Sequence, residues 1–529
     1  MPAIPILCGS ETGNAEYCAD MLSAALDSEG FESEVIDMMA FDGPSIAHHP
    51  LVFIVTSTYG NGGPPSNAEE LLAYLQTSAI DLSAVRFAVC GLGSHTFDRF
   101  AQCGKDFEAA MLKAGATQVF DRVDCDDDYE EGYGKFEASA LSYLQEHGLS
   151  SPGAASVPRV APTPTPAPRE TTAQAPLVAK RLLSRSGSKK ETMHYELDLS
   201  NVAMNYEVGD CFAIHAINSR NAIQEVIDSA GLRSDDAVEF GGATTTLEKA
   251  LERSCLLQCT DALFEHVAER GTPGAAARAA REGGRDAVRA YRKDRHVAEL
   301  LSENAAGALD AQRFVNSLRK LQPRLFSVAS APGGDRVAFT VETVRYERGG
   351  RHVRGVASGW LADDIEVGDT VAIHHVPNDA YRFPEDERPV IMIGPGTGIA
   401  PFRAYLEQRH RSGERRPTWL FFGHQHEAAD FLYEEEIKSW LEAGTLTRAD
   451  FAWSRDQTEK VYVQDKMRAN ADELWNWLER GASVFVCGDA KRMAPGVVAA
   501  IKAIASEHGD GDAYFEKLLA EDRYKADVY

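Results

Sequence analysis

Three glycine-rich loops near the start of the chain carry residue types that could bind a flat, phosphorylated cofactor. The first, "GSETGNAE", follows a short apolar run and offers hydroxyl and backbone N–H groups to a phosphate at an expected helix start. It lacks the Gly-Lys-Ser/Thr ending of a Walker A loop, which argues against a nucleoside triphosphate. The other two, "TSTYGNGGPPSNA" and "GLGSHTFDRF", each present one aromatic residue, Tyr59 and Phe97. Two exposed rings beside a phosphate loop would form a slot for a monophosphorylated, apolar ring system.

A second group of polar residues lies in the last third of the chain. In "PVIMIGPGTGIAPFRAYLEQR" an apolar strand runs into a Gly-Pro-Gly turn and then a helix, so that a pyrophosphate can approach the backbone at Gly396 and Thr397. The acidic residue that would hold ribose hydroxyls in a conventional dinucleotide fold falls at Glu414, which two arginines follow. Further on, "WSRDQTEKVYVQD" provides a guanidinium, an ammonium and hydroxyls, which suit a 2′-phosphate and favour NADPH over NADH. These side chains belong to Ser454, Arg455, Lys460, Tyr462 and Gln464.

Each of these features has a plainer interpretation when it is taken alone. Tyr59 and Phe97 could be hydrophobic plugs in ordinary turns, and the cluster around Arg455 and Lys460 could be a solvated surface. Cys487, at the end of the apolar run in "VFVCGDAKRM", could be a small buried hydrophobe. The cofactor interpretation therefore depends on the elements that position these residues.

Hydrophobic periodicity predicts three folded units and one linker. Residues 1–148 alternate buried strands, such as "IPILCG" and "LVFIVTS", with amphipathic helices, which predicts a doubly wound α/β sheet. Residues 149–176 are rich in Pro, Ala and Thr and predict a flexible linker. Residues 177–387 contain half-polar strands that predict an antiparallel barrel, interrupted at about 220–320 by a helical insertion. Residues 388–529 return to a Rossmann-like α/β pattern.

Composition narrows the classes of function. Residues 1–150 hold 24 Asp and Glu against 6 Lys and Arg, so they carry most of the net charge of −26. Such a field repels nucleic acid; it suits a basic protein partner, although solubility alone would also explain it. No apolar run reaches the roughly 18 residues of a membrane span, so we expect a cytoplasmic protein without membrane insertion. The nine cysteines are scattered and predict neither disulfides nor an iron–sulfur cluster, and we expect no metal site.

Longer motifs resemble one enzyme family over nearly the whole chain. The first-domain loops are similar to the three FMN loops of flavodoxins. Several later motifs resemble the diflavin NADPH reductases, and among them most of all the flavoprotein subunits of NADPH–sulfite reductase: "RLFSVAS", "GVASGWLAD", "GPGTGIAPFRAYLEQR", "FFGHQHEAADFLYEEE", "SRDQTEKVYVQDKM", "VCGDAKRM" and the terminal "RYKADVY". The resemblance implies that hydride passes from NADPH to FAD and that electrons then pass through FMN to a haem protein. A sulfite-reductase haemoprotein is the favoured acceptor. The alternatives are a stand-alone soluble reductase for another haem protein or a flavodoxin-like carrier, and a slow electron-storage or regulatory module.

The same resemblance implies the site residues. For FMN they are Ser10, Glu11, Thr12, Gly13, Asn14, Ala15, Ser57, Thr58, Tyr59, Gly60, Leu92, Gly93, Ser94, His95, Thr96 and Phe97. For FAD they are Thr260, Arg324, Leu325, Phe326, Ser327, Thr340, Val341, Glu342, Tyr346, Gly355, Val356, Ala357, Ser358 and Tyr529. For NADP they are Gly396, Thr397, Ser454, Arg455, Lys460, Tyr462, Gln464 and Cys487. The residues placed beside the reacting atoms are Ser327, Cys487, Asp527 and Tyr529, with Ser327 near the flavin N5.

Two positions depart from the family pattern. Phe326 stands where the family usually has Tyr, so the ring can stack on the flavin but forms no hydroxyl hydrogen bond. Gly496 stands where the family has an Asp near NADP. At the chain end, the resemblance implies that Tyr529 covers the flavin face opposite Phe326 and must move before nicotinamide can enter.

Overall fold

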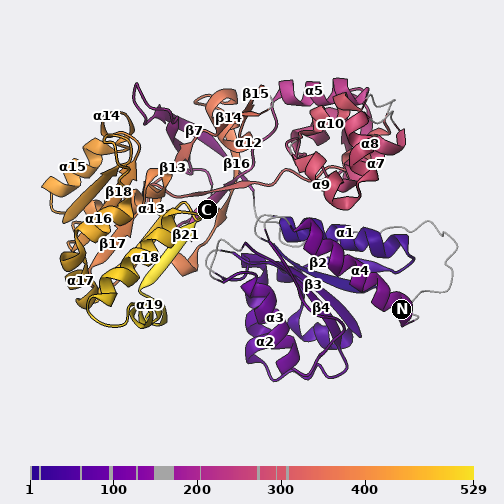
Figure 1. The fold of residues 1–529 in the computed structure, drawn as a ribbon, viewed down its shortest axis with the longest axis horizontal. Helices are drawn as coiled ribbons and strands as arrows, with labels where there is room; N and C mark the ends of the chain where they lie inside the picture. Colours follow the sequence, from indigo (N-terminus) through magenta and orange to yellow (C-terminus); the bar gives the residue numbers. More distant parts are fainter. Residues whose placement is uncertain are drawn as a thin grey trace.

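The computed structural model describes residues 3–10, 13–59, 62–94, 99–126, 129–147, 172–202, 204–270, 274–293, 295–304, 309–348 and 350–529. Within them the chain forms an N-terminal α/β domain, an antiparallel barrel with a helical insertion, and a C-terminal α/β domain (Figure 1). The predicted fold class is thus confirmed. The predicted linker ends earlier than expected, because residues 173–176 already belong to the first barrel strand; residues 149–171 of that linker lie outside the described part.

The N-terminal domain is a parallel sheet in the order β2-β1-β3-β4-β5, with β6 beside β4. Helices α1 and α4 cover one face and α2 and α3 the other, because the strands bury apolar side chains on both sides. The loops after β1, β3 and β4 therefore meet at one edge. The elements are β1 (Ile4–Gly9), α1 (Asn14–Ser28), β2 (Ser33–Asp37), β3 (Leu51–Ser57), α2 (Glu69–Thr77), β4 (Arg86–Leu92), α3 (Gln102–Lys113), β5 (Thr117–Gln118), β6 (Val123–Cys125) and α4 (Glu130–Glu146).

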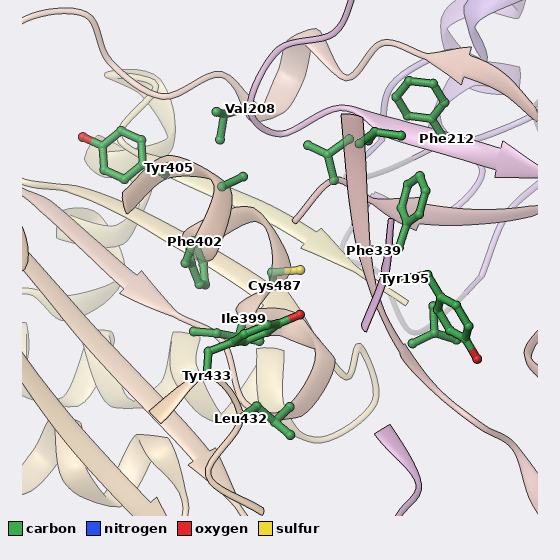
Figure 2. Packing of buried hydrophobic residues seen from close by; sticks show 14 of the residues in the cluster. Tyr195, Val208, Phe212, Phe339, Ile399, Phe402, Tyr405, Leu432, Tyr433 and Cys487 are labelled. Atoms are coloured by element: carbon green, nitrogen blue, oxygen red, sulfur yellow. The ribbon is translucent and has the colours of Figure 1, made fainter. Parts of the chain in front are cut away.

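The barrel is an antiparallel sheet in the order β12-β9-β16-β7-β8-β13. A bridge between Val328 and Phe339 joins its two end strands. The rings of Phe212 and Phe339 pack edge to face inside it (Figure 2). Its elements are β7 (Ala173–Leu182), β8 (Thr192–Asp198), β9 (Cys211–Ile214), β12 (Arg324–Ser327), β13 (Arg336–Glu342), the hairpin β14 (Arg345–Arg348) and β15 (Arg351–Arg354), α12 (Val356–Gly359), a π-helix (Trp360–Asp364) and β16 (Thr370–Val376).

Between β9 and β12 the chain leaves the barrel and forms a helical unit with its own apolar core. This unit occupies the sequence range in which the insertion was expected. It consists of α5 (Arg220–Ala230), the hairpin β10 (Ala237–Phe240) and β11 (Ala243–Thr246), α6 (Leu247–Glu252), α7 (Asp261–Arg270), α8 (Ala275–Glu282), α9 (Arg285–Lys293), α10 (Val297–Glu303) and α11 (Ala311–Asn316).

The C-terminal domain is a parallel sheet in the order β19-β18-β17-β20-β21. The last strand extends to the chain end: the Tyr529 N–H donates to the Gly488 carbonyl (3.0 Å), and the Ala490 N–H donates to the Tyr529 carbonyl (3.1 Å). The terminal backbone is thus held in the sheet. The elements are β17 (Val390–Ile393), α13 (Ala400–Ser412), β18 (Thr418–His424), α14 (Glu427–Asp430), α15 (Glu434–Glu442), β19 (Arg448–Trp453), α16 (Val463–Ala469), α17 (Ala471–Glu479), β20 (Ser483–Gly488), α18 (Met493–Ser506), α19 (Gly511–Ala520) and β21 (Tyr524–Val528).

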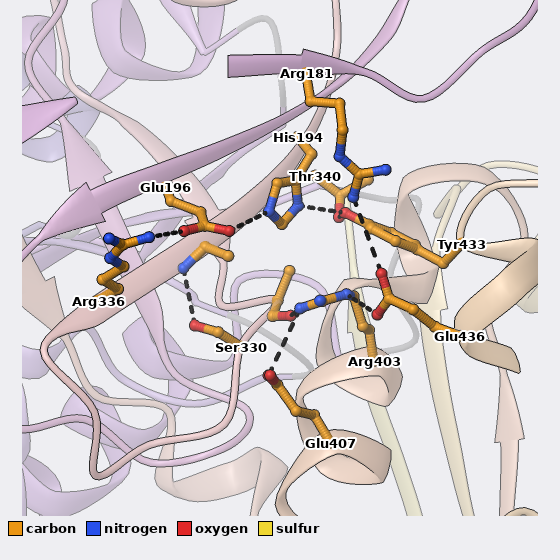
Figure 3. Close-up of polar contacts among 12 residues, drawn as sticks. Arg181, His194, Glu196, Ser330, Arg336, Thr340, Arg403, Glu407, Tyr433 and Glu436 are labelled. Atoms are coloured by element: carbon orange, nitrogen blue, oxygen red, sulfur yellow. Dashed lines mark hydrogen bonds and ion pairs between the residues drawn. The ribbon is translucent and has the colours of Figure 1, made fainter. Parts of the chain in front are cut away.

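A buried polar network fixes the barrel against the C-terminal domain (Figure 3). The Tyr433 hydroxyl lies 3.0 Å from His194 Nδ1 and 2.7 Å from Thr340 Oγ1. The Arg403 guanidinium lies over the Tyr433 ring and pairs with Glu436 at 2.8 Å. Because these partners come from both domains, the two units are held in one orientation.

We expect this interface to weaken as the pH falls from about 6.5 to 4. Burial, together with the Arg403 charge, lowers the pKa of His194 to about 4. In the unfolded chain the pKa is about 6.5. The stabilisation by neutral His194 is therefore complete above pH 6.5 and is lost on acidification, by at most about 3 kcal/mol. In thermal unfolding from pH 7.5 to 4.5, His194→Gln should show a shallower pH dependence than the wild type; equal slopes would contradict this assignment.

Candidate active site

The edge of the N-terminal sheet fits a phosphate group. Helix α1 starts after Gly13, whose φ is +78°, and among the described residues no side chain caps its first N–H groups. The Ser10 hydroxyl is buried and has no hydrogen-bond partner among the residues that the structure describes. In the second loop, Tyr59 and Gly63 exchange two backbone hydrogen bonds of 2.9 Å. A phosphate at the start of α1 would satisfy both the helix N–H groups and Ser10.

The structure places the remaining predicted FMN residues unevenly. Thr58 and Gly93 have backbone bonds to Leu92 and Cys125, which tie the second and third loops to the sheet edge. Asn14, Ala15, Ser57 and Ser94 lie at the same edge, because they adjoin the carboxyl ends of β1, β3 and β4. Six predicted residues fall outside the described part: Glu11, Thr12, Gly60, His95, Thr96 and Phe97.

Three residues that are far apart in the sequence meet between the barrel and the C-terminal sheet. The Ser327 hydroxyl, on β12, donates to Asp527 Oδ2 on β21 at 3.0 Å. Cys487, on β20, is the register partner of Asp527 in the parallel strand pair. The predicted residues Ser327, Cys487 and Asp527 thus form one cluster.

Burial controls the protonation of this cluster. It raises the pKa of the Asp527 carboxyl, because the hydrogen bond from Ser327 offsets only part of the desolvation. It also raises the pKa of the fully buried Cys487 thiol, and the Asp527 charge adds to this effect. The thiol is therefore protonated at neutral pH, which suits packing against a ring better than nucleophilic attack.

Cys211 also belongs to this cluster, although the sequence did not single it out. Its Sγ lies 3.8 Å from Ser327 Oγ, so that its S–H can donate to the hydroxyl that in turn donates to Asp527. The two residues are register partners in the antiparallel pair of β9 and β12. Within the sequence Cys211 looks like one more small strand residue, and only the strand pairing reveals its neighbour.

Several residues expected to hold FAD lie on β12, on the hairpin that follows it and at the start of α12. Arg324 is exposed and forms no ion pair within the described residues. The Tyr346 side chain is 43% exposed on the hairpin that precedes α12. Helix α12 begins after Gly355 without a side-chain cap, and Ser358 Oγ accepts a hydrogen bond from the Val344 N–H at 3.1 Å. Gly355 has no room for a side chain, because its Cβ would lie 2.7 Å from Ser358 Oγ.

Phe326 is partly buried, with its ring centroid 6.5 Å from that of Phe339. Leu325 packs on the opposite side of β12 against Cys211 and its neighbours. Val356 and Ala357 form the first turn of α12.

Four predicted FAD residues already have structural partners for their side chains. The Thr260 hydroxyl accepts from the Leu263 N–H at 3.0 Å and donates to the Ser317 carbonyl, inside the helical insertion. The Thr340 hydroxyl bonds with Tyr433, Glu342 pairs with Lys190, and Val341 is buried. Contacts of Thr260 and Thr340 with FAD would therefore involve their backbone atoms.

The residues expected to hold the 2′-phosphate follow β19. Arg455 and Lys460 are exposed, and neither pairs with a carboxylate in the part of the chain that the structure describes. The adjacent Asp456 instead pairs with His426 at 2.8 Å. Ser454 Oγ donates to the His424 carbonyl, and the Tyr462 ring is 45% exposed. Two free cations beside hydroxyl groups fit a phosphate.

Glu414, the conventional ribose ligand by spacing, pairs instead with Arg409 at 3.0 Å. Gly496 stands where the family has an Asp. A Cβ at this position would lie 3.2 Å from Gln464 Nε2. An acidic side chain there would thus be next to the Gln464 amide.

The last side chain reaches the Gly-Pro-Gly-Thr turn after β17. The Tyr529 hydroxyl lies 2.7 Å from Thr397 Oγ1, and the residue is 54% exposed. Gly396 has a φ of +60°, and a Cβ on Gly398 would lie 2.0 Å from the Cys487 carbonyl oxygen. The Tyr529 ring therefore stands beside the turn expected to hold the pyrophosphate, next to the Ser327–Asp527 pair.

Asp527→Asn should slow hydride transfer from NADPH and stabilise the protein above neutral pH. Because burial raises the pKa of Asp527, the carboxyl stabilises the fold when it is protonated, and this contribution is lost as the pH rises through its folded pKa. Asparagine cannot ionise, so the stability of the variant does not fall for this reason as the pH rises. Its side-chain oxygen still accepts the hydrogen bond from Ser327. We expect a higher unfolding temperature than the wild type at pH 8, a smaller difference at pH 5, and slower flavin bleaching in stopped flow. Equal unfolding temperatures at both pH values would refute the burial argument.

No helix in the described ranges combines the length and apolar character needed to cross a membrane. The same residues contain no group of three or more His, Cys, Asp or Glu side chains that could hold a metal ion.

Comparisons with known proteins agree with the domain architecture described above. Residues 6–137 match the flavodoxin family model, residues 165–268 the FAD binding domain, and residues 392–499 the oxidoreductase NAD-binding domain. The chain is 35% identical to the sulfite reductase [NADPH] flavoprotein alpha-component of Photorhabdus laumondii, over all of this chain and 91% of the relative. It is 36% identical to those of Yersinia enterocolitica (99% and 90%) and Neisseria meningitidis (100% and 89%). The chain therefore belongs to the diflavin NADPH reductases, in the family of the sulfite reductase flavoprotein alpha-component.

Proposed function

We propose that this chain supplies electrons from NADPH to the haemoprotein of a sulfite reductase. When bound, FAD would supply a hydride acceptor for NADPH, and FMN would supply single-electron transfer to the haem protein. The observation that supports this function best is the cluster of Ser327, Cys487 and Asp527, which three separate strands bring together beside the Gly-Pro-Gly-Thr turn. The similarity to sulfite reductase flavoprotein components supports the choice of acceptor.

The residues of the chain have distinct parts in this function. Arg455 and Lys460 bind the 2′-phosphate and select NADPH. Thr397 and the turn that contains it position the pyrophosphate and nicotinamide. Ser327, held by Asp527, presents its hydroxyl where the flavin N5 lies in the family. Phe326 and Tyr529 exclude water from the two faces of the ring, since an exposed flavin would react with oxygen.

Steady-state oxidation of NADPH by the full-length protein, loaded with both flavins, tests this function. We expect turnover with cytochrome c as an artificial acceptor, and sulfide formation when a bacterial sulfite-reductase haemoprotein and sulfite are supplied instead. Rapid cytochrome c reduction without sulfide formation would point to a stand-alone reductase for another acceptor. Little turnover with either acceptor would point to a storage or regulatory module. Both outcomes would overturn the proposal.

A further inference from the structure

A cysteine thiol lies on one side of the Ser327 hydroxyl. Cys211 Sγ is 3.8 Å from Ser327 Oγ, and the two residues are register partners on β9 and β12, so their side chains project from the same face of the sheet. Ser327 in turn donates to Asp527 Oδ2 at 3.0 Å. The three side chains thus form a chain of hydrogen bonds that runs from Cys211 through Ser327 to the Asp527 carboxyl.

The thiol keeps its hydrogen and is the donor at the start of this chain. Cys211 is 3% exposed, and burial raises the pKa of its thiol well above the usual range, with the Asp527 charge adding to the effect. A hydrogen bond with the Tyr59 hydroxyl opposes this rise only in part. Because the Ser327 hydrogen is directed at Asp527, the bond between Cys211 and Ser327 needs the S–H as its donor.

The backbone on both sides of this contact is held in place. Asp210, the residue before Cys211, is fully buried and bonds to His375 Nε2 at 2.7 Å. The Asp210 carbonyl accepts a hydrogen bond from the Val328 N–H, next to Ser327, at 2.9 Å. The thiol and the hydroxyl therefore meet at positions that the barrel strands fix.

The thiol also belongs to a small apolar cluster. Cys211, Ala213 and Val376 form this cluster on β9 and β16, and Leu325 of β12 packs against it. A valine at position 211 would keep these apolar contacts and lack the hydrogen-bond donor. The contribution of the donor can thus be separated from the contribution of packing.

The two contacts of the Ser327 hydroxyl use two of its three hydrogen-bonding positions. A serine hydroxyl has one hydrogen and two lone pairs. The hydrogen is directed at Asp527 and one lone pair at Cys211, which leaves one lone pair as an acceptor. In this orientation Ser327 can accept one further hydrogen bond, but it can donate one only if it turns away from Asp527.

This difference matters for a flavin whose N5 lies near Ser327, as membership of the diflavin reductases implies. The oxidised flavin has no hydrogen on N5 and needs a donor there, whereas the reduced flavin carries an N5 hydrogen and needs an acceptor. The observed orientation of Ser327 therefore suits the reduced form. A hydroxyl that accepts a hydrogen bond also donates more strongly, so Cys211 strengthens the bond to Asp527 and opposes rotation of Ser327.

We propose that Cys211 is a positioning residue of the hydride-transfer site: it holds the Ser327 hydroxyl on Asp527 and so favours the reduced over the oxidised form of bound FAD. Cys211 itself exchanges neither electrons nor protons with the flavin. The inference rests on the proposed function only for the placement of Ser327 beside FAD. Its new content is a residue that acts through Ser327 on the flavin equilibrium and not on the binding of NADPH.

A redox equilibrium in the full-length protein tests the proposal. The chain is loaded with FAD and without FMN, so that one flavin is observed, and it is equilibrated with a reference dye during slow photochemical reduction. Cys211→Val should lower the ratio of reduced to oxidised FAD about two- to fivefold at a given dye potential, because one hydrogen bond from a weak donor is lost. For a two-electron couple this corresponds to about 10 to 20 mV.

A buried thiol in another domain provides the matched control. Cys103 is fully buried, and its Sγ lies 3.3 Å from the Thr56 hydroxyl in the N-terminal domain. Cys103→Ala should leave the FAD equilibrium unchanged. A shift of the same size in this variant would show that loss of any buried thiol has the effect, which would overturn the proposal.

A second substitution shows whether the effect passes through Ser327. In a Ser327→Ala background, Cys211→Val should have no further effect on the FAD equilibrium, because no hydroxyl remains to be positioned. An equal shift in both backgrounds would contradict the proposed role, and so would an unchanged equilibrium in Cys211→Val alone.

Two features of the experiment keep its outcome decisive. If valine overpacks the cluster and the variant loses FAD, Cys211→Ala removes the same donor, and the same two- to fivefold decrease is expected. The electrons come from the photochemical reductant, so the equilibrium depends neither on NADPH nor on an acceptor protein. A failure of the proposed function would appear as absent turnover with NADPH, whereas a failure of this inference would appear as an FAD equilibrium that does not respond to Cys211.

Discussion

Arg455→Ala combined with Lys460→Ala should raise KM for NADPH about 30- to 1,000-fold and leave KM for NADH nearly unchanged. Each cation lacks a carboxylate partner in the described part of the chain, so both are available to the 2′-phosphate. A hydrogen bond to a charged group contributes about 1.5 to 3 kcal/mol, and exposure to solvent lowers this to about 1 to 2 for each cation here. NADH lacks the 2′-phosphate, so its binding loses no contact in this variant. Steady-state kinetics with both nucleotides measure the difference.

A double variant of the neighbouring helix provides the control for this experiment. Lys466→Ala with Arg468→Ala removes two positive charges from α16, beside the proposed phosphate site. If long-range attraction of the nucleotide were the cause, both double variants would raise KM for NADPH similarly, and added salt would remove the difference. A proportional rise for NADPH and NADH in the Arg455 and Lys460 variant would show that this cluster is structural.

Tyr529→Ala should raise kcat/KM for NADH about 5- to 150-fold and change kcat/KM for NADPH much less. In the proposed function the ring covers the flavin, and its hydroxyl lies 2.7 Å from Thr397 Oγ1, so nicotinamide would have to displace both contacts. Stacking contributes about 0.5 to 1.5 kcal/mol and the hydrogen bond a similar amount. NADPH already offsets this barrier through its 2′-phosphate, whereas NADH cannot. Release of NADP⁺ should become slower in the variant.

Tyr529→Phe separates the two contributions. It keeps the ring and removes only the hydroxyl, so kcat/KM for NADH should rise about 2- to 12-fold. The backbone of Tyr529 is hydrogen-bonded on both sides to the loop after β20, so the expected movement is a rotation of the side chain rather than of the whole tail. An unchanged preference between NADPH and NADH, together with an unshifted FAD spectrum in Tyr529→Ala, would mean that the terminal residue has no part in catalysis.

The order of the domains could be predicted from the sequence because the signals are local. Buried apolar runs such as "LVFIVTS" and "PVIMIG" appear as β3 and β17, each at the centre of a parallel sheet. Glycine positions were equally informative, since Gly13 and Gly396 adopt positive φ values at the two turns expected to hold phosphates. The boundary of the linker was less accurate, because "AQAP" has little apolar period and becomes strand only by pairing with β16.

The candidate site was only partly predictable. The resemblance to diflavin reductases supplied Ser327, Cys487 and Asp527, and the structure brings them together. It did not supply Cys211. This residue matters because of its neighbours, and no spacing in the sequence marks a neighbour that lies on another strand.

The sequence by itself determined the fold class and the cofactor classes, and it predicted a cation pair for the 2′-phosphate. Each of these depends on residues close together in the chain: a hydrophobic period, a glycine turn or a short polar run. Only the tertiary structure decided that Ser327 meets Asp527 two hundred residues away, that the terminal strand is held in the sheet up to Tyr529, and that Lys320 binds Glu16. The physical reason is that strand order, register and domain docking minimise the free energy of the whole chain, and no local segment contains that information.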